Sequence, residues 1–506
     1  MPQGDADHVA ASPDGPPEDP PSDEAPVRRH RRGRWVRRTT AALVVLVLVA
    51  AGATYELDLG SRWFGRHRPS PVTAPAEVLP PAGLRLPAAR RAAAVATPRP
   101  EGTASAAAVR RAVASLVASR KLGRHVVVVV AQLSDGRVVY RHGKGPVTPA
   151  STMKLLTAVA ALATLGPLHR FTTSVVLAPS SNRVVLVGGG DPLLTGAPAP
   201  ASAYPARANL VALAARTAAA LKSRGRTQVR LGYDTSLFSG PSVDPQWEPS
   251  YVPEDVVSPV TPLWVDEGRA KPGLADRSPD PALAATKVFA GALEQRHIRV
   301  LGTPSRAVAP PASAGGRRVA AVRSAPLAEI VQHIVEASDN EGAETLSRQV
   351  AVARGESASF VGGARAVRGA LRRLGISTRG DRIYDGSGLS RHDRLEPDTL
   401  LSVIRAAASS AHPGLRSAVS TLPVAGFTGS LAARFRTGDP AGRGTVRAKT
   451  GTLNGVHGLA GTVTTQDGVV LGFVAVADRV RPENTLDARS LLDRVAAALG
   501  GCRCRG

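Results

Sequence analysis

The sequence predicts an α/β fold of the α+β type, to which both strands and helices contribute. Near the start of the folded region, residues 125–131 and 137–140 are rich in β-branched side chains and predict two strands joined by a short turn. Near its end, segments 445–452, 459–465 and 469–475 alternate like strands, and a Gln-Asp-Gly turn joins the last two. Helical patterns lie before, between and after these strands, so helices complete the fold.

The remaining elements follow from the same periodicities. In chain order they are a helix at 107–121, strands at 171–177 and 183–187, helices at 206–223, 281–296, 327–337 and 341–350, and a closing helix at 485–499. The Pro-rich stretch 233–266 is expected to be irregular.

Length and charge limit the possible functions. At 506 residues the chain has room for two or three domains and a large core. The net charge of +24 would suit nucleic-acid binding, but aromatic residues make up only 4% and no zinc-finger or aromatic-basic RNA signature is found. We therefore predict no nucleic-acid partner. The two cysteines, Cys502 and Cys504, lie in the last five residues and cannot link the core.

The N-terminal region predicts a membrane anchor. Residues 1–38 begin with an acidic, Pro-rich stretch and end with seven arginines, which is typical of a disordered cytoplasmic tail. The apolar segment 39–56 can span a hydrocarbon core at 1.5 Å per residue with some help from its flanks. Because positive flanks stay in the cytoplasm, the rest of the chain is expected outside the plasma membrane, in the cell envelope.

A cleaved signal peptide is the alternative to an anchor. Ala51-Gly52-Ala53 has the small-x-small form of a cleavage site, although the leader before it is long. Both interpretations export the rest of the chain, attached to the membrane in one case and secreted in the other. Residues 57–103, rich in Pro, Ala and Arg, then predict a semi-extended linker.

A possible nucleophile and base lie in the segment Ser151-Thr152-Met153-Lys154. Apolar residues at helical spacing follow it, so Ser151 and Lys154 are one turn apart on the same face of a helix. A buried neutral amine could take the serine proton, and the helix N-terminus could stabilise an oxyanion. A Ser N-cap followed by a surface Lys is the alternative. Only seven of the 64 basic residues are Lys, however, and only Lys154 has a Ser three positions before it.

Two further stretches suit this chemistry. Lys449-Thr450-Gly451-Thr452 lies on a predicted strand, where a cation and hydroxyls could hold a carboxylate. The chemistry also needs a Ser and an Asn that could relay protons and bind an amide. Two stretches contain such a pair, Ser180-Ser181-Asn182 and Ser338-Asp339-Asn340. The first lies between two strands and predicts a hairpin turn. We therefore choose the second, which lies between two helices and could also act as an N-cap.

These motifs, in this order, resemble the class C low-molecular-mass penicillin-binding proteins, the D-alanyl-D-alanine carboxypeptidase/endopeptidase (peptidase S13) family. The resemblance extends from about residue 104 to 480. Besides Lys449-Thr450-Gly451-Thr452, the matching stretches are Gly188-Gly189-Gly190-Asp191-Pro192, Asp234-Thr235-Ser236-Leu237-Phe238, Tyr384-Asp385-Gly386-Ser387-Gly388-Leu389-Ser390-Arg391 and Leu422-Pro423-Val424-Ala425-Gly426.

The resemblance implies a role for each motif. Ser151 would be the acylated nucleophile, Lys154 the general base, Ser338 a proton shuttle to the leaving D-alanine, and Asn340 a contact for Lys154 and the substrate amide. Lys449, Thr450 and Thr452 of the K-T-G-T motif, in which Gly451 allows close approach, would bind the terminal carboxylate. The backbone N–H groups of Ser151 and Thr452 would form the oxyanion hole. The Asp385-Gly386-Ser387-Gly388 turn would border the cleft.

The resemblance also implies a fold like that of serine β-lactamases and penicillin-binding proteins. An antiparallel sheet built from the early hairpin and the last three strands would pack between the terminal helices and an all-helical subdomain carrying Ser151. Members of this family carry extra domains inserted between the first and second motifs. Here the gap between Ser151 and Ser338 is 187 residues, which is short for two such inserted domains. We therefore expect a catalytic domain from 104–166 and 265–500 and one inserted α/β subdomain at 167–264.

The function implied is a serine D-Ala-D-Ala carboxypeptidase, with endopeptidase activity less certain because it depends on the insert. Its partners would be peptidoglycan stem peptides and, as covalent inhibitors, β-lactams; no cofactor or metal is implied. A serine β-lactamase would share the three motifs but needs a Glu-positioned water, and no Glu in the relevant interval has the class A context. A non-catalytic peptidoglycan-binding protein would not need the complete set of motifs.

Overall fold

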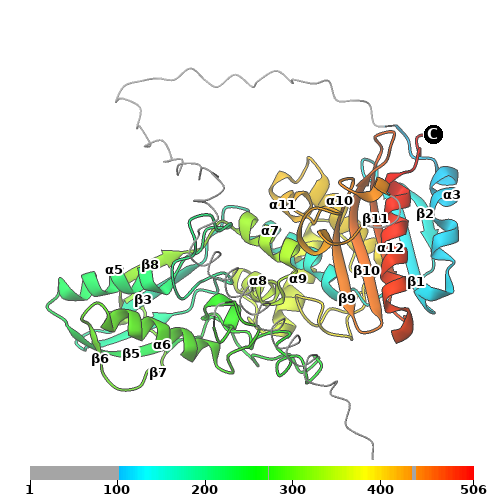
Figure 1. The fold of residues 1–506 in the computed structure, drawn as a ribbon. Helices are drawn as coiled ribbons and strands as arrows, with labels where there is room; N and C mark the ends of the chain where they lie inside the picture. The colour runs from blue at the N-terminus through cyan, green and yellow to red at the C-terminus, as the bar shows by residue number, and fades with distance from the viewer. Residues whose placement is uncertain (1–101, 272, 436–439) are drawn as a thin grey trace, which may run out of the picture. The chain divides into compact units, whose positions relative to one another are not determined.

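The computed structural model describes residues 102–271, 273–435 and 440–506 (Figure 1). The predicted tail, membrane segment and nearly all of the linker lie outside the described residues. Within the described ranges, no helix combines the length and the apolar character needed to cross a membrane.

The main sheet has five antiparallel strands in the order β2-β1-β11-β10-β9. The strands are β1 (Val126–Gln132), β2 (Val138–His142), β9 (Val446–Leu453), β10 (Val456–Thr464) and β11 (Val470–Ala477). The early hairpin thus joins the last three strands, as expected, because β1 pairs with β11 along its whole length. The chain ends of the folded region therefore meet in one sheet, and β9 forms an edge of it.

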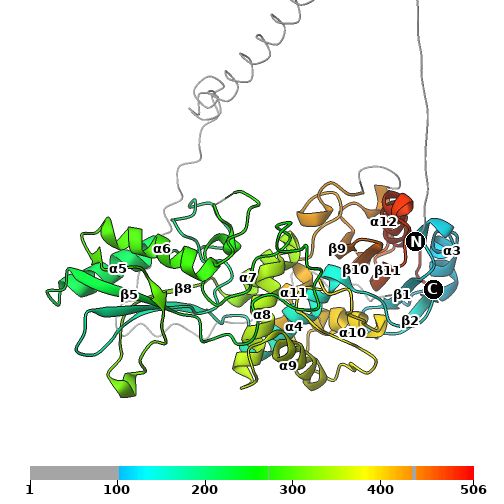
Figure 2. The same cartoon turned by 90° about the horizontal axis from the view of Figure 1, so that it is seen from below.

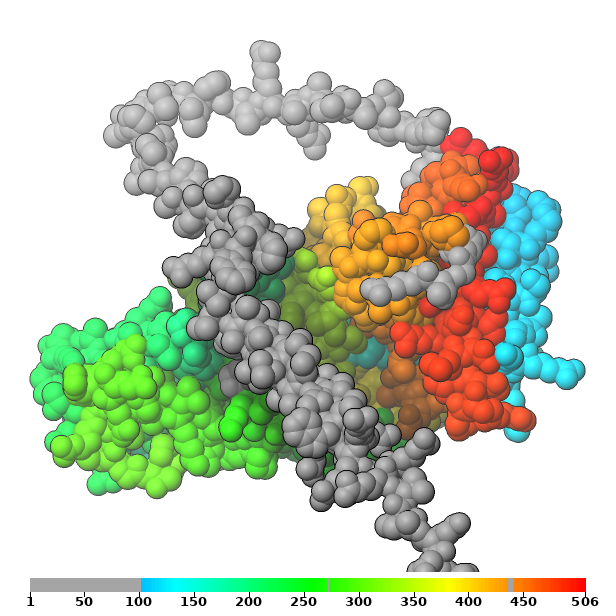
Figure 3. Space-filling view, viewed as in Figure 1, coloured from blue at the N-terminus to red at the C-terminus, as the bar shows by residue number. Residues whose placement is uncertain are grey.

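Both faces of this sheet are covered, and β1 shows how. Val127 and Val129 belong to one apolar core, whereas Val128 and Val130 belong to the other. The terminal helices α3 (Ala106–Val117) and α12 (Thr485–Gly500) cover the second of these faces. They lie side by side at the molecular surface, α3 in cyan and α12 in red (Figure 3).

The first face of the sheet packs against an all-helical region (Figure 1). Its helices are α4 (Lys154–Leu165), α7 (Leu327–Ala337), α8 (Asn340–Ala353), α9 (Phe360–Arg373), α10 (Pro397–Ala408) and α11 (Ser417–Ser420). The first nine residues of α4 are all buried, so this helix is enclosed on every side over most of its length and lies at the centre of the region. It contacts α7, α8, α9 and α10.

A second sheet has its own core and two packed helices (Figure 2). The strand order is β6-β5-β4-β3-β8, and β7 also pairs with β5. The elements are β3 (Thr172–Leu177), β4 (Arg183–Val187), α5 (Leu210–Lys222), β5 (Gln228–Asp234), α6 (Pro281–Glu294), β6 (Arg299–Val300), β7 (Ser305–Arg306) and β8 (Arg317–Arg323).

This sheet runs past residue 264, where the predicted insert ends. The reason is a pairing between distant segments, because β8 is antiparallel to β3, with Thr172 opposite Arg323. Local periodicity cannot show a pairing between distant segments. The insert predicted from the sequence therefore ends before the last strands of this sheet. Ser180-Ser181-Asn182 lies in the turn between β3 and β4, as the sequence indicated.

The predicted irregular stretch contains no helix or long strand between β5 and a short 3-10 turn, Asp266–Gly268. It is nevertheless packed: Trp247 and Trp264 are buried in a small core that includes Phe360 of α9. Trp247 Nε1 also donates to Asp385 Oδ2 at 2.8 Å. The stretch is therefore held against the helical region by apolar burial and by a buried hydrogen bond.

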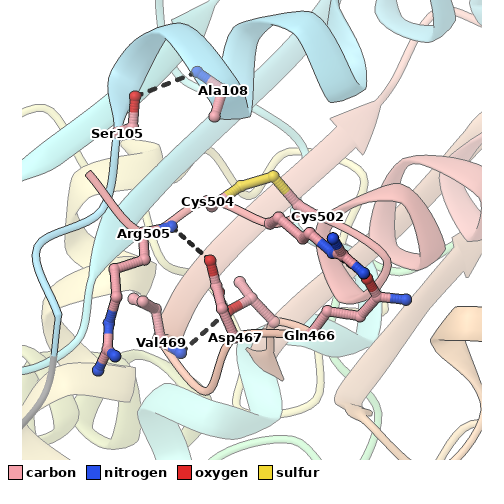
Figure 4. Close-up of a disulfide and its surroundings, with 10 residues drawn as sticks. Ser105, Ala108, Gln466, Asp467, Val469, Cys502, Cys504 and Arg505 are labelled. Atoms are coloured by element: carbon pink, nitrogen blue, oxygen red, sulfur yellow. Dashed lines mark hydrogen bonds between the residues drawn. A yellow bond between two sulfur atoms is a disulfide. The ribbon is translucent and has the colours of Figure 1, made fainter.

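The C-terminal residues return to the beginning of the folded region. Cys502 and Cys504 form a disulfide with each other, and the tail that they belong to lies against the start of α3 (Figure 4). Ser105 N donates to the Cys504 carbonyl at 2.7 Å, and Arg505 N donates to Asp467 Oδ2 at 2.6 Å. The cysteines thus stabilise a local loop and do not link the cores, consistent with their spacing.

Candidate active site

Ser151 and Lys154 lie where the chain enters the central helix. Ser151 belongs to a 3-10 turn, Ala150–Met153, which continues directly into α4 at Lys154. The two side chains are therefore one turn apart, and Lys154 Nζ lies 2.9 Å from Ser151 Oγ. The lysine is completely buried, whereas the serine is only partly buried. The hydroxyl is thus accessible and the amine lies behind it.

Three oxygen atoms surround the Lys154 amine, and two of them can only accept. Besides Ser151 Oγ, they are Asn340 Oδ1 at 2.7 Å and the Ser387 carbonyl at 2.9 Å. The Asn340 side chain is oriented by its own Nδ2, which donates to the Val256 carbonyl at 3.1 Å. A neutral amine has two N–H groups for these two acceptors. Its lone pair then points at the Ser151 hydroxyl.

The surroundings also favour the neutral amine. Burial lowers the pKa of Lys154 to about 8, although the carboxylates of Asp385, Asp339 and Glu344 favour the charged form. A lysine with this pKa is present as free base in a substantial fraction near neutral pH, unlike an ordinary surface lysine. Lys154 can therefore accept a proton from its neighbouring hydroxyl.

The corner between α7 and α8 brings the second motif to the same place. Ser338 ends α7 in the left-handed region, with φ at 62°, and Asn340 begins α8. Asp339 caps α8, because its side chain accepts from Gly342 N at 2.8 Å. Ser338 Oγ lies 2.8 Å from Lys449 Nζ, so this corner contacts both buried lysines, through Asn340 and Ser338.

The third motif lies on the edge strand β9. Lys449 is completely buried, and burial together with the charges of Lys154 and Arg434 lowers its pKa well below the usual range. Ala448 N donates away from β10, to the Pro423 carbonyl. Since alternate residues of a strand point the same way, the N–H groups of Thr450 and Thr452 also point away from β10. The edge of β9 that carries the N–H groups of Thr450 and Thr452 therefore faces Ser151, which lines the same cavity.

These residues meet at a cavity of about 260 Å³. Its lining consists of Ser151, Tyr251, Val256, Ser338, Asn340, Leu389, Thr450, Thr452 and Leu453. Lys154 and Lys449 lie behind the lining, in contact with Ser151 and Ser338. Gly451 allows close packing between β9 and the turn that carries Ser151. A Cβ at this position would lie 2.7 Å from the Pro149 carbonyl oxygen, so a larger residue would push the strand away.

Comparison with known proteins decides what this arrangement belongs to. The model of the D-Ala-D-Ala carboxypeptidase 3 (S13) family matches residues 109–279 and 271–499. A carboxypeptidase DacB of Mycolicibacterium smegmatis is 36% identical over 94% of this chain and 99% of its own length. A carboxypeptidase of Mycobacterium tuberculosis is 34% identical over 93% of this chain and 99% of its own length.

The chain belongs to the D-Ala-D-Ala carboxypeptidase 3 (S13) family. The predicted family and enzyme class, a serine-type D-Ala-D-Ala carboxypeptidase, are thereby confirmed. The fold class is confirmed by the crystal structure of penicillin-binding protein 4 of Haemophilus influenzae, with a TM-score of 0.62. That structure is 23% identical and covers 78% of this chain and 98% of its own.

The structure adds residues to this S13 site that the sequence did not indicate. Tyr251 and Val256 come from the irregular stretch, which carried no signal. Ser387 contributes a backbone carbonyl, for which no side-chain pattern exists, although its turn was expected to border the cleft. Glu344 supports this turn by accepting from Gly386 N and Ser387 N. Its carboxylate thus positions the carbonyl that contacts Lys154.

Gly388 lets the same turn pack directly against the nucleophile. Its φ is +83°, and a Cβ there would collide with the Ala150 carbonyl and lie 2.9 Å from Met153 Cβ. Ala150 is itself in the left-handed region, with φ at 46°. The serine is thus presented by a backbone that depends on close contact with a glycine.

We predict that Gly388→Ala displaces the turn that carries Ser151. The matched control is Gly375→Ala, because Gly375 has a similar φ of +75° but open space where a Cβ would lie. The control should lose about 1 kcal/mol of the free energy of unfolding from the unfavourable φ alone. Gly388→Ala should lose clearly more and also acylate with penicillin at least about 10-fold more slowly. Denaturant unfolding and labelling kinetics measure both; equal losses in the two variants would contradict the close contact.

Proposed function

We propose that the chain hydrolyses the terminal D-Ala-D-Ala bond of peptidoglycan stem peptides through an acyl-enzyme on Ser151, and that β-lactams acylate the same serine. The observation that carries this proposal is the environment of the Lys154 amine. Two of its three oxygen neighbours are obligate acceptors, and the third is the Ser151 hydroxyl. This is the arrangement of a nucleophile and its general base.

In the acylation step, the Ser151 hydroxyl transfers its proton to Lys154 as Oγ attacks the carbonyl carbon of the penultimate D-alanine. Negative charge then develops on the carbonyl oxygen. The proposed oxyanion donors are the backbone N–H groups of Ser151 and Thr452, two of the residues that line the cavity. One such donor typically contributes about 3 kcal/mol. Lys154 gives up the proton taken from Ser151 as the leaving nitrogen is protonated and is neutral again for the second step. There it accepts a proton from the water that attacks the acyl carbonyl carbon and returns one to Ser151 Oγ as the ester bond breaks.

The leaving D-alanine needs a proton on its nitrogen and a cation for its carboxylate. Ser338 is proposed to donate the proton, and its contact with Lys449 Nζ offers a route for replacing it. Lys449, Thr450 and Thr452 are proposed to bind the carboxylate. Because an anion favours the charged form of a lysine, substrate binding would raise the lowered pKa of Lys449.

A serine β-lactamase is the competing enzyme, and it needs a carboxylate to position the deacylating water. Among the described residues that line the cavity, none is a carboxylate. Glu344 is engaged by the turn at Gly386, and Glu341 forms an ion pair with Arg277 at 3.0 Å. This favours slow deacylation of a bound penicillin. A non-catalytic peptidoglycan-binding protein would have no use for the contact between Lys154 and Ser151.

We predict that a fluorescent penicillin labels the chain stably and that Ser151→Ala abolishes the labelling without changing the far-UV circular dichroism. Lys154→Arg should reduce labelling severely as well, because arginine keeps the charge but cannot act as a base. Digestion of purified muropeptides should release D-alanine, and the ratio of this product to cleaved dimers measures any endopeptidase activity. Continued labelling of the Ser151 variant, or rapid turnover of nitrocefin, would refute the assignment.

The rate of acylation should depend on pH through Lys154. The base is the neutral amine, which is populated above the pKa of about 8 and lost below it. Acylation should therefore rise almost tenfold per pH unit up to about pH 8 and level off above it. Stopped-flow measurement of penicillin acylation from pH 6 to 10 tests this expectation. A rate that is constant below pH 7 would mean that another group, or an already neutral lysine, provides the base.

The proposed location is the outer face of the plasma membrane, with segment 39–56 as a single-pass anchor. The positively charged flank and the length of the apolar segment support this proposal. In fractionated cells the intact chain should remain in the membrane pellet after a high-salt wash, and a chain without 39–56 should not be exported. Recovery of a shortened chain in the medium would favour the cleaved signal peptide instead.

A further inference from the structure

Three side chains that have no role in the proposed reaction converge beside the second motif. Glu267 comes from the 3-10 turn that ends the irregular stretch, His333 from α7, and Asp339 from the corner between α7 and α8. One ligand atom from each lies within 4.8 Å of the others. His333 Nε2 lies 3.4 Å from Glu267 Oε1 and 4.0 Å from Asp339 Oδ2. A single imidazole nitrogen therefore faces two carboxylates.

One of these ligand atoms is buried without a hydrogen-bond partner. The Asp339 side chain is only 3% exposed, and its Oδ1 caps α8, but Oδ2 accepts no hydrogen bond. Such an atom is costly in a protein interior unless something binds it. Gly342 contributes to the space around Oδ2, because a Cβ at that position would collide with it. The capping role of Asp339 thus explains one of its oxygens and leaves the other unexplained.

The charge and the ligand types suit a divalent cation. Two carboxylates that bind a divalent ion balance its charge, and the imidazole adds a nitrogen ligand. A set with one nitrogen and two oxygens favours first-row transition metals such as Zn²⁺ over Mg²⁺ or Ca²⁺. Arg269 does not occupy the cluster, because its guanidinium contacts the other Glu267 oxygen, Oε2, at 3.3 Å. That contact would orient the carboxylate from behind.

We propose that Glu267, His333 and Asp339 form a three-ligand site for a divalent transition metal, with Zn²⁺ as its most suitable occupant and a water molecule in the open position. The required adjustment is small, because ligand atoms around a tetrahedral zinc lie about 3.3 Å apart. Glu267 and His333 are each 19% exposed at the side chain, so an ion can reach the cluster from solvent.

The site would connect two parts of the chain that meet at the cavity. Glu267 belongs to the turn after the irregular stretch, whose Tyr251 and Val256 line the cavity. Asp339 lies between Ser338 and Asn340, and its backbone continues into both. An ion bound here would hold the α7–α8 corner against that turn. The metal would act at a distance from the reacting atoms, as a brace for Ser338 and Asn340.

The ligands explain why the sequence indicated no metal. They lie at positions 267, 333 and 339, so no compact motif is present. Within the described residues, no other three His, Cys, Asp or Glu side chains bring their ligand atoms within 4.8 Å of one another. The cysteines are bonded to each other and therefore do not compete for the ion.

The test is calorimetric titration of the chelator-treated full chain with ZnCl₂, without reductant. We expect one high-affinity ion per chain. His333→Gln should weaken this binding about 100-fold or more, and Asp339→Asn should weaken it while keeping a helix cap. The matched control is His142→Gln, which removes an imidazole from β2, outside the cluster, and should bind Zn²⁺ like the unmodified chain.

Two further measurements do not depend on catalysis. Zn²⁺ at about 100 times its Kd should raise the melting temperature by about 3 °C in the unmodified chain but not in His333→Gln. Co²⁺ should give visible absorption bands of a four- or five-coordinate site that the same substitution removes. Equal Zn²⁺ affinity in His333→Gln and His142→Gln, or no binding by the unmodified chain, would overturn the proposal. Because penicillin labelling is measured separately, failure of the metal site leaves the proposed reaction intact.

Discussion

The burial of the Lys154 amine is the constraint on which the rest of the site depends. An ammonium in the protein interior loses its hydration, and here its hydrogen-bond partners are all uncharged oxygens. Burial therefore raises the free energy of the charged form relative to the neutral amine and lowers the pKa of Lys154 to about 8. The same partners then decide where the lone pair points. A reactive serine is thus the consequence of placing a lysine where it cannot easily stay charged.

Two parts of the fold position the hydrogen-bond partners of the Lys154 amine: the corner between α7 and α8 and the turn that contains Ser387. Asn340 must begin α8, so α7 ends in a left-handed residue and Asp339 caps the next helix. The Ser387 carbonyl must point inward, so Glu344 holds the N–H groups of its turn and Gly388 lets the turn touch the residue before the nucleophile. Each of these features is ordinary in isolation. Together they leave the Lys154 amine only one neighbour that can give it a proton.

The second buried lysine makes the site asymmetric. Burial lowers the pKa of both Lys449 and Lys154, and the positive charge of Lys154 lowers the pKa of Lys449 further. A substrate carboxylate beside β9 would raise the pKa of Lys449, which belongs to this edge strand of the sheet. The site would then contain one charged lysine for binding and one neutral lysine for proton transfer. The proposed metal would support the corner that contacts both.

The sequence by itself determines the elements and two of the three motifs. The three-residue spacing of Ser151 and Lys154 places their side chains one turn apart on the same face of a helix, and alternation along β9 places Thr450 and Thr452 on the same side of the strand. It also distinguishes Ser338-Asp339-Asn340 from the hairpin turn at Ser180, because helix and strand periods differ. Only the tertiary structure decides that β8 extends the second sheet, that the Ser387 carbonyl faces Lys154, and that Glu267 meets His333 and Asp339. These depend on contacts between residues far apart in the chain and on backbone atoms that every residue possesses, and neither leaves a local pattern.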